Sequence, residues 1–154
     1  VDEANSAIGL AIASFDDKGH RALLTRVQND LFDLGADLAT PAVDRDFAPS
    51  EMVLRMVPAQ AEWIEAQIDA LNERLEPLTS FVLPGGSEAA ARVHVARATT
   101  RAAERAMTAL AGESPVNAAA SAYINRLSDL LFVLARVLNE DGASDVNWVP
   151  GANR

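Results

Sequence analysis

A turn followed by a long alanine-rich run constrains this chain more than any other part of its sequence. Pro84, Gly85 and Gly86 cannot lie inside a helix at low cost, so they predict a turn. Ser87 is a favourable N-cap residue, and the alanine-rich residues that follow it have strong helix propensity. The sequence therefore predicts a long helix that begins after Ser87 and ends near Gly112.

The polar residues of this predicted helix gather on one side. At about 100° per residue, one face or its flank holds Arg97, Arg101, Glu104 and Arg105. The opposite face is expected to be buried; its residues are Val95, Thr99, Ala102, Ala106 and Leu110. Two interpretations of the arginine row stay open. It could form an anion site, because guanidinium groups bind phosphate and carboxylate bidentately, or it could be a solvated face with ion pairs to acidic neighbours, which is the commoner case.

Apolar residues recur at helical spacing in four other segments. Helices are expected over residues 2–14, 20–39, 58–75 and 115–139. The last of these has a broad apolar surface, formed by Tyr123, Leu127, Leu130, Leu131, Leu134 and Leu138.

The remaining segments are expected to be irregular. Residues 41–49 contain two prolines and predict a loop, whereas residues 51–57 are ambiguous between a short helix and an extended piece. Residues 1–139 are predicted to form a single helical-bundle domain, and residues 140–154 are predicted to form a C-terminal tail.

The composition agrees with this assignment. Hydrophobic residues make up 49% of the 154 residues but aromatic residues only 5%. Alanine and leucine dominate, and these side chains suit closely packed helices better than sheets. No strand pattern recurs, so the predicted fold class is all-α, in one domain.

Charge and cysteine content exclude several classes of function. The net charge of −9 argues against nucleic acid and anionic membranes as general partners, and no apolar run reaches transmembrane length. The absence of cysteine excludes disulfides, thiolate metal sites and cysteine nucleophiles, and it fits a reducing, cytoplasmic compartment. The sequence begins at Val1 without an initiator methionine, so an upstream segment, with any targeting signal, is expected outside it.

A second polar stripe lies on the otherwise apolar segment 115–139. Asn125, Asp129, Phe132 and Arg136 fall within a narrow sector. This sector either lines a pocket or meets solvent, because a buried polar side chain without a partner is costly. The solvated alternative would include an ion pair between Arg126 and Asp129, three residues apart.

Several common catalytic motifs are absent from the sequence. The turn at 84–86 lacks the lysine of a Walker loop, and the Glu-x-x-His pair of di-iron bundles does not occur. No serine lies in a nucleophile elbow. His20 and His94 are the only histidines, and neither predicts a metal site; His94 is expected to be a packing or surface residue. Any chemistry is therefore expected to depend on positioning and charge, without metal-ligating residues.

Four motifs, in this order, resemble those of one enzyme family. They are Val1-Asp-Glu-Ala-Asn-Ser-Ala-Ile-Gly9, Phe81-Val-Leu-Pro-Gly-Gly-Ser87, Arg97-x-x-x-Arg101-x-x-Glu104-Arg105 and Tyr123-Ile-Asn125-Arg126-Leu-Ser-Asp129-Leu-Leu-Phe-Val-Leu-Ala-Arg136. The residues from Gln28 to Ala39 also fit the second helix of that family. Over essentially its whole length, the chain resembles the PduO-type ATP:cob(I)alamin adenosyltransferases.

The resemblance implies a fold, an assembly and a reaction. The fold is a five-helix bundle with ferritin-like, up-and-down packing, assembled as a homotrimer with active sites between adjacent subunits. The reaction transfers the 5′-deoxyadenosyl group of ATP to the cobalt of cob(I)alamin and releases triphosphate. The implied cofactors are Mg²⁺ with ATP and, in some members, K⁺, and the implied partners are a corrinoid reductase and an adenosylcobalamin-dependent enzyme.

The resemblance also implies roles for individual residues. The nucleotide is expected to contact Arg101, Glu104, Arg105 and Asn125. Arg101 is the expected catalytic residue, because its charge would stabilise the departing triphosphate.

Three further residues acquire implied roles. Phe81 is expected to stand against the lower face of the corrin, where it would exclude an axial ligand and ease reduction of Co(II) to Co(I). Arg97 is expected to pair with Asp2 of a neighbouring subunit.

The main alternative is a helical oligomer that binds corrinoid or nucleotide without turnover, as a carrier or sensor. The family's Thr/Gly-rich segment, which wraps the triphosphate, lies upstream of the first motif and outside this sequence. ATP affinity is expected to depend on that segment.

Overall fold

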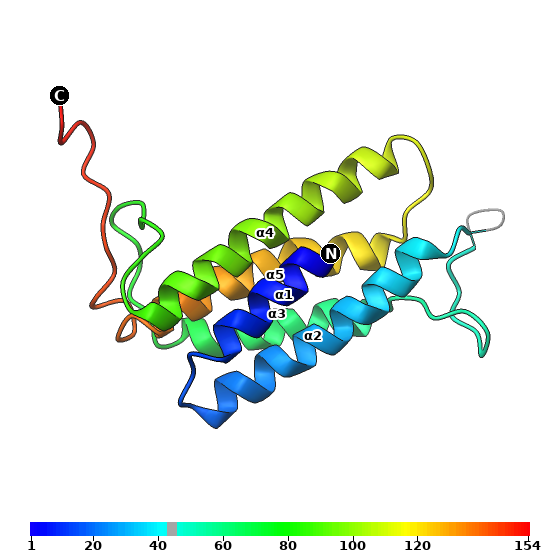
Figure 1. The fold of residues 1–154 in the computed structure, drawn as a ribbon, viewed down its shortest axis with the longest axis horizontal. Helices are drawn as coiled ribbons and strands as arrows, with labels where there is room; N and C mark the ends of the chain where they lie inside the picture. The colour runs from blue at the N-terminus through cyan, green and yellow to red at the C-terminus, as the bar shows by residue number, and fades with distance from the viewer. Residues whose placement is uncertain (43–45) are drawn as a thin grey trace.

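Five α-helices make up most of the structure, a computed structural model that describes residues 1–42 and 46–154 (Figure 1). Within these residues the helices are α1 (Asp2–Ile12), α2 (Lys18–Ala39), α3 (Pro58–Asn72), α4 (Glu88–Ala111) and α5 (Ala118–Val137). The helices run side by side along one direction of the molecule. The predicted all-α bundle is confirmed, and each helix lies within a few residues of its expected position.

Local side chains explain where the helices begin. Asp17, Ser87 and Asn117 each accept a hydrogen bond from a backbone N–H in the helical turn that follows, at 2.7, 3.1 and 3.0 Å. The hydrogen bond to Asp17 also holds the pKa of its carboxyl below the ordinary value. Pro58 opens α3, where its fixed φ favours the first turn and its missing N–H is not needed.

Helix α5 forms the centre of the bundle. It packs against α3 and α4, while α1 packs against α2 and α4 (Figure 1). The predicted apolar surface of α5 is confirmed: Tyr123, Leu127, Leu130, Leu131 and Leu134 are buried, and Leu138 is half-buried.

The buried face of α4 differs from the predicted one. Val95 and Leu110 are 53% and 38% exposed, and Ala106 is also exposed, so the prediction that they are buried was wrong. The buried residues are instead Ala90, Val93, His94, Ala96, Thr100 and Met107. The alanine-rich sequence offers two nearly equivalent apolar stripes, and the choice between them is made by α1 and α5, which cover α4 from the other side.

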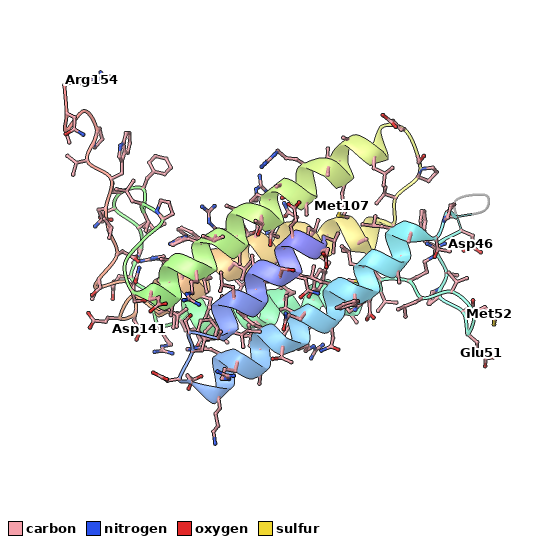
Figure 2. All side chains as sticks on the ribbon, viewed as in Figure 1. Asp46, Glu51, Met52, Met107, Asp141 and Arg154 are labelled. Atoms are coloured by element: carbon pink, nitrogen blue, oxygen red, sulfur yellow. The ribbon has the colours of Figure 1, made fainter. Side chains whose placement is uncertain are left out.

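The connections lie at opposite ends of the bundle. Glu51 and Met52 lie at the tip of the segment between α2 and α3, whereas Asp141 and Arg154 lie at the other end (Figure 2). The predicted loop over 41–49 is irregular at 41–42 and 46–49, while residues 43–45 lie outside the described part of the chain. Residues 51–57 contain bends and irregular backbone rather than a helix, and Val57 is extended. None of the helices in the described residues is long and apolar enough to cross a membrane.

Candidate active site

Two hollows follow one another along the side of the molecule that α4 and α5 share. The first lies between the two helices and is lined by Glu104, Met107, Thr108, Ser121, Ala122, Ile124, Asn125 and Arg126. The second lies toward the start of α4 and is lined by Leu78, Thr79, Ser80, Phe81, Val82, Arg97, Phe132, Trp148 and Pro150. Arg101 comes one helical turn after Arg97 and one turn before Glu104, so its position on α4 is between the two hollows.

In the first hollow, α4 and α5 are joined by polar side chains. Asn125 Nδ2 donates to Glu104 Oε1 at 2.8 Å, and the other carboxylate oxygen of Glu104 pairs with the Arg101 guanidinium. The Glu104 side chain is 18% exposed and that of Arg101 is 45% exposed. The carboxylate therefore holds the guanidinium in place while nearly half of the arginine side chain stays accessible to a ligand.

The other arginines of the row have different surroundings. Arg105 is exposed on the flank of the row. Arg97 is half-buried and lines the second hollow, and its Nε is buried without a hydrogen-bond partner among the described residues. Within the part of the chain that the structure describes, the row therefore contains one local ion pair, between Arg101 and Glu104, rather than a full set of pairs to acidic neighbours.

His94 comes three residues before Arg97 on α4 and is buried, at 2% exposure, so of the two expected alternatives it is a packing residue rather than a surface residue. Its ring centroid is 6.4 Å from that of Phe132, and neither ring nitrogen has a partner among the described residues. Burial, together with the positive charge of Arg97, lowers the pKa of His94 below its ordinary value.

The aromatic residue predicted for the corrin is at the second hollow. Phe81 is 76% exposed, and its ring meets the ring of Trp148 edge to face, with centroids 5.8 Å apart. A large apolar ring held at the mouth of a hollow is suited to contact a flat, largely apolar ligand.

Asp2 lies apart from these residues within one chain. It is exposed at the first position of α1, where it lines a separate hollow with Asn5 and Phe32. Among the described residues no ion pair joins Asp2 to Arg97 within the chain. The predicted pair between subunits stays a prediction.

The residues of the polar sector of α5 have different surroundings. Arg126 pairs with Asp129 at 2.9 Å, as the solvated interpretation predicted, and also with Glu65 at 2.6 Å. Asn125 and Phe132 line the two hollows, as the pocket interpretation predicted, whereas Arg136 does not meet solvent. It is 7% exposed and donates to Asp145 Oδ2 at 2.8 Å, because residues after α5 fold back over it.

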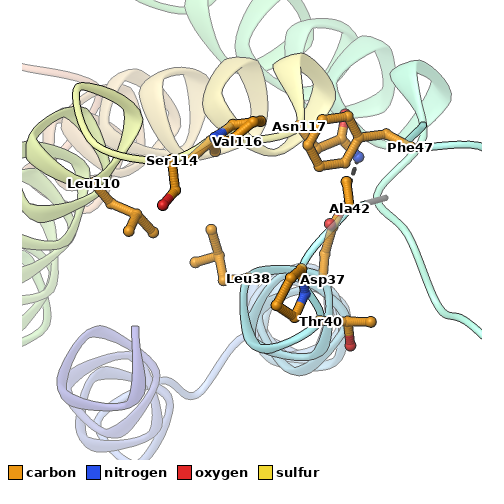
Figure 3. Close-up of a pocket in the computed structure, with 11 residues that line it drawn as sticks. Asp37, Leu38, Thr40, Ala42, Phe47, Leu110, Ser114, Val116 and Asn117 are labelled. Atoms are coloured by element: carbon orange, nitrogen blue, oxygen red, sulfur yellow. Dashed lines mark hydrogen bonds between the residues drawn. The ribbon is translucent and has the colours of Figure 1, made fainter. Parts of the chain in front are cut away.

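A buried polar cluster at the other end of the bundle was not predicted. Asp37 accepts a hydrogen bond from Arg55 Nη1 at 2.8 Å. It also accepts one from Asn117 Nδ2 at 2.6 Å, beside a cavity of about 220 Å³ that both residues line (Figure 3). Phe47 lies over this cavity, with the Arg55 guanidinium 5.2 Å from its ring. An aspartate within the apolar spacing of α2 was the signal in the sequence, but its partners are distant along the chain.

Comparisons with known proteins agree with this arrangement. A family model described as cobalamin adenosyltransferase matches residues 1–138. The corrinoid adenosyltransferase of Mycobacterium tuberculosis (strain H37Rv) is 47% identical over 156 residues, which cover 99% of this chain and 78% of that protein. The corrinoid adenosyltransferase PduO of Salmonella typhimurium is 41% identical over 141 residues, which cover 92% of this chain and 41% of that protein.

Solved structures are also similar. A variant PduO-type ATP:corrinoid adenosyltransferase from Lactobacillus reuteri, complexed with cobalamin and ATP, superimposes with a TM-score of 0.86 at 33% identity, over 97% of this chain and 80% of that chain. Another variant of that enzyme, complexed with ATP, superimposes with a TM-score of 0.83 at 34% identity, over 96% of this chain and 82% of that chain. The sequence motifs, the fold and these matches agree, and the chain belongs to the cobalamin adenosyltransferase family.

Proposed function

We propose that this protein transfers the 5′-deoxyadenosyl group of ATP to the cobalt of a reduced corrinoid. In this step cobalt(I) attacks the C5′ atom, a cobalt–carbon bond forms, and the C5′–oxygen bond breaks. Triphosphate leaves with the electron pair of that bond, and cobalt is formally oxidised to cobalt(III). The observation that carries the proposal is the linked set of Arg101, Glu104 and Asn125: Glu104 and Asn125 line the first hollow, and Arg101 lies between it and the second. A solved relative from Lactobacillus reuteri is complexed with cobalamin and ATP.

The first hollow is proposed to hold the nucleotide. Glu104 and Asn125 already contact each other across α4 and α5, so they present fixed polar groups to a ligand without further ordering. Arg101, with Arg105 on its flank, would place positive charge where the triphosphate gains negative charge. Mg²⁺ is proposed to enter with the ATP phosphates, since Mg²⁺ in nucleotide sites is usually held by one or two carboxylates and the substrate. K⁺ is proposed as an additional activator.

The second hollow is proposed to hold the corrinoid. Phe81 would lie against the lower face of the macrocycle and keep an axial ligand off the cobalt. A cobalt(II) centre without that ligand is easier to reduce to the nucleophilic cobalt(I) state. This role is supported by the exposure of the Phe81 ring at the mouth of the hollow.

The functional unit is proposed to be a homotrimer with each site shared by two chains. The half-buried Arg97 and the exposed Asp2 would pair across that boundary, and this pair would satisfy an arginine whose Nε has no hydrogen-bond partner among residues 1–42 and 46–154 of one chain. A corrinoid reductase would supply the electron, and an adenosylcobalamin-dependent enzyme would use the product. A cytoplasmic location, expected from the absence of cysteine, stays a prediction.

An anaerobic assay with reduced cobalamin and ATP tests the proposal. Formation of the cobalt–carbon bond changes the visible absorbance of the corrinoid, and each turnover should also release one triphosphate. If both substrates bind but neither product forms, the protein is a carrier or sensor and the proposed transfer is wrong.

A further inference from the structure

The segment that follows α5 returns to the residues that carry Phe81. Leu83 N donates to the carbonyl oxygen of Val146 at 2.7 Å, and Trp148 N donates to the carbonyl oxygen of Phe81 at 2.8 Å. Ser80 Oγ also donates to the carbonyl oxygen of Trp148 at 2.9 Å. Residues 80–83 and 146–148 therefore run antiparallel and meet at an isolated β-bridge between Val82 and Asn147; we call this pair of segments the clasp.

The clasp is tied to the end of α5 by buried polar contacts. Asp145, directly before the clasp, accepts a hydrogen bond from Arg136 at 2.8 Å, and both side chains are at most 9% exposed. Asn139 donates to the carbonyl oxygen of Gly85 at 3.2 Å and accepts from Ser87 N at 2.9 Å. The two segments of the clasp are thus held against the same helix end, one through Asp145 and the other through residues 85–87.

In this position, Trp148 contacts Phe81. Their rings meet edge to face at an interplanar angle of 65°, and both line the second hollow. The Phe81 ring is 76% exposed, so little else in the chain restricts its rotation. Edge-to-face pairs prefer one relative orientation of the two rings, so this contact restricts the orientation of Phe81.

We infer that Trp148 is a positioning residue for Phe81: held by the clasp, it fixes the Phe81 ring in the orientation that the corrinoid meets. The inference rests on the proposed function, because it assigns the second hollow to the corrinoid. It adds a residue from beyond the helical bundle to the reaction.

Three full-length variants test the inference: Trp148→Ala, Trp148→Phe and, as a matched control, Val149→Ala. Val149 is the next residue, is 63% exposed and does not line the second hollow. Three quantities should be measured: the KM for cobalamin, the KM for ATP, and the fraction of bound cobalt(II) corrinoid without a lower axial ligand, from its spectrum. Circular dichroism of the helices and amide exchange of Leu83 in the ligand-free protein complete the set.

Trp148→Ala should raise the KM for cobalamin about three- to tenfold, which corresponds to the usual strength of an edge-to-face pair. It should also lower the fraction of corrinoid without the axial ligand and speed exchange at Leu83, while the KM for ATP and the helix content stay unchanged. Trp148→Phe should have a cobalamin KM and an axial-ligand fraction close to those of wild type, and Val149→Ala should behave as wild type.

Equal cobalamin KM and axial-ligand fractions in wild type and Trp148→Ala would overturn the inference, as would a parallel rise of both KM values. Failure of the proposed function looks different, because then wild type itself would form no adenosylcobalamin. In that case the exchange of Leu83 still decides whether Trp148 holds the residues around Phe81, and unchanged exchange would refute it.

Discussion

Gly86 illustrates how one residue can fix a loop beside the site. Its φ is +99°, a conformation that side chains with a Cβ rarely adopt. A Cβ there would also lie 2.2 Å from the side-chain oxygen of Asn139. Gly86 is therefore required both by its backbone conformation and by the side chain that ties this loop to α5.

Gly86→Ala should destabilise the protein by about 1–3 kcal/mol, the usual cost of a strained backbone conformation, and should displace Asn139. Gly85→Ala is the matched control, because Gly85 has no positive φ and no atom lies within 4 Å of its would-be Cβ. Denaturant unfolding measures both variants. A loss in Gly86→Ala no larger than that in Gly85→Ala would contradict this explanation.

His94 gives the protein a predictable response to acid. Its pKa is lowered from 6.5 in the folded state by burial and by Arg97, while Asp145 acts in the opposite direction. The unfolded chain therefore takes up a proton at a higher pH than the folded chain. Neutral His94 therefore contributes to the free energy of unfolding. This contribution is complete above about pH 6.5 and decreases as the pH falls, until His94 is protonated in the folded state too.

The expected result is a melting temperature that decreases between pH 7 and 5.5 more steeply in wild type than in His94→Gln. Both proteins still contain the same carboxylates, so the difference between the two slopes isolates the histidine. Parallel slopes would show that His94 does not make this contribution.

For the helices, the sequence predicts those features that depend on residues close together in the chain. The helix starts at Ser87 and Pro58 were predictable because an N-cap or a proline acts within one turn. The polar row from Arg97 to Glu104 was predictable because helical spacing alone places it. The buried face of α4 was not, since Val95 and Val93 are equally apolar and only the packing of α1 and α5 distinguishes them.

Contacts between elements that are distant along the chain could not be predicted from the sequence either. Asp37 on α2 meets Asn117, the N-cap of α5, and Arg55 from the segment before α3. The separations of 80 and 18 residues give no local pattern to read. The folding back of Asp145 onto Arg136 escaped prediction for the same reason: the pairing depends on turns at 138–144 that no periodicity specifies.

Arg55→Ala should destabilise the protein by about 3–5 kcal/mol, because it leaves the carboxylate of Asp37 buried without its charged partner. The two side chains are only 3% and 1% exposed. In contrast, Arg74→Ala removes an exposed pair with Asp141, whose side chains are 52% and 39% exposed, and should cost less than about 1 kcal/mol. Similar losses in the two variants, measured by chemical denaturation, would be inconsistent with a buried cluster that ties the elements together.

At the scale of the whole molecule, the proposed trimer makes a prediction about Asp2 and Arg97. Reversing either charge, with Asp2→Arg or Arg97→Asp, should reduce both the trimer fraction and the activity, because like charges would then face each other between subunits. The double variant should regain much of both. Light scattering after gel filtration gives the oligomeric state, and a double variant no better than the single ones would argue that the two residues do not meet.

In the proposed mechanism, Arg101 lies between the nucleotide and the corrinoid and stabilises the departing triphosphate. The most direct measurement is an anaerobic single turnover that quantifies adenosylcobalamin and triphosphate in wild type, Arg101→Ala and Arg92→Ala. Arg92 is on the same helix but pairs with Glu88 and the carbonyl oxygen of Leu10, away from both hollows, so it controls for lost charge. Wild type and Arg92→Ala should react at similar rates and form one triphosphate for each adenosylcobalamin. Arg101→Ala should react more slowly by about 100-fold or more, with its helices intact. A rate for Arg101→Ala within about twofold of wild type would show that this guanidinium does not stabilise the departing triphosphate.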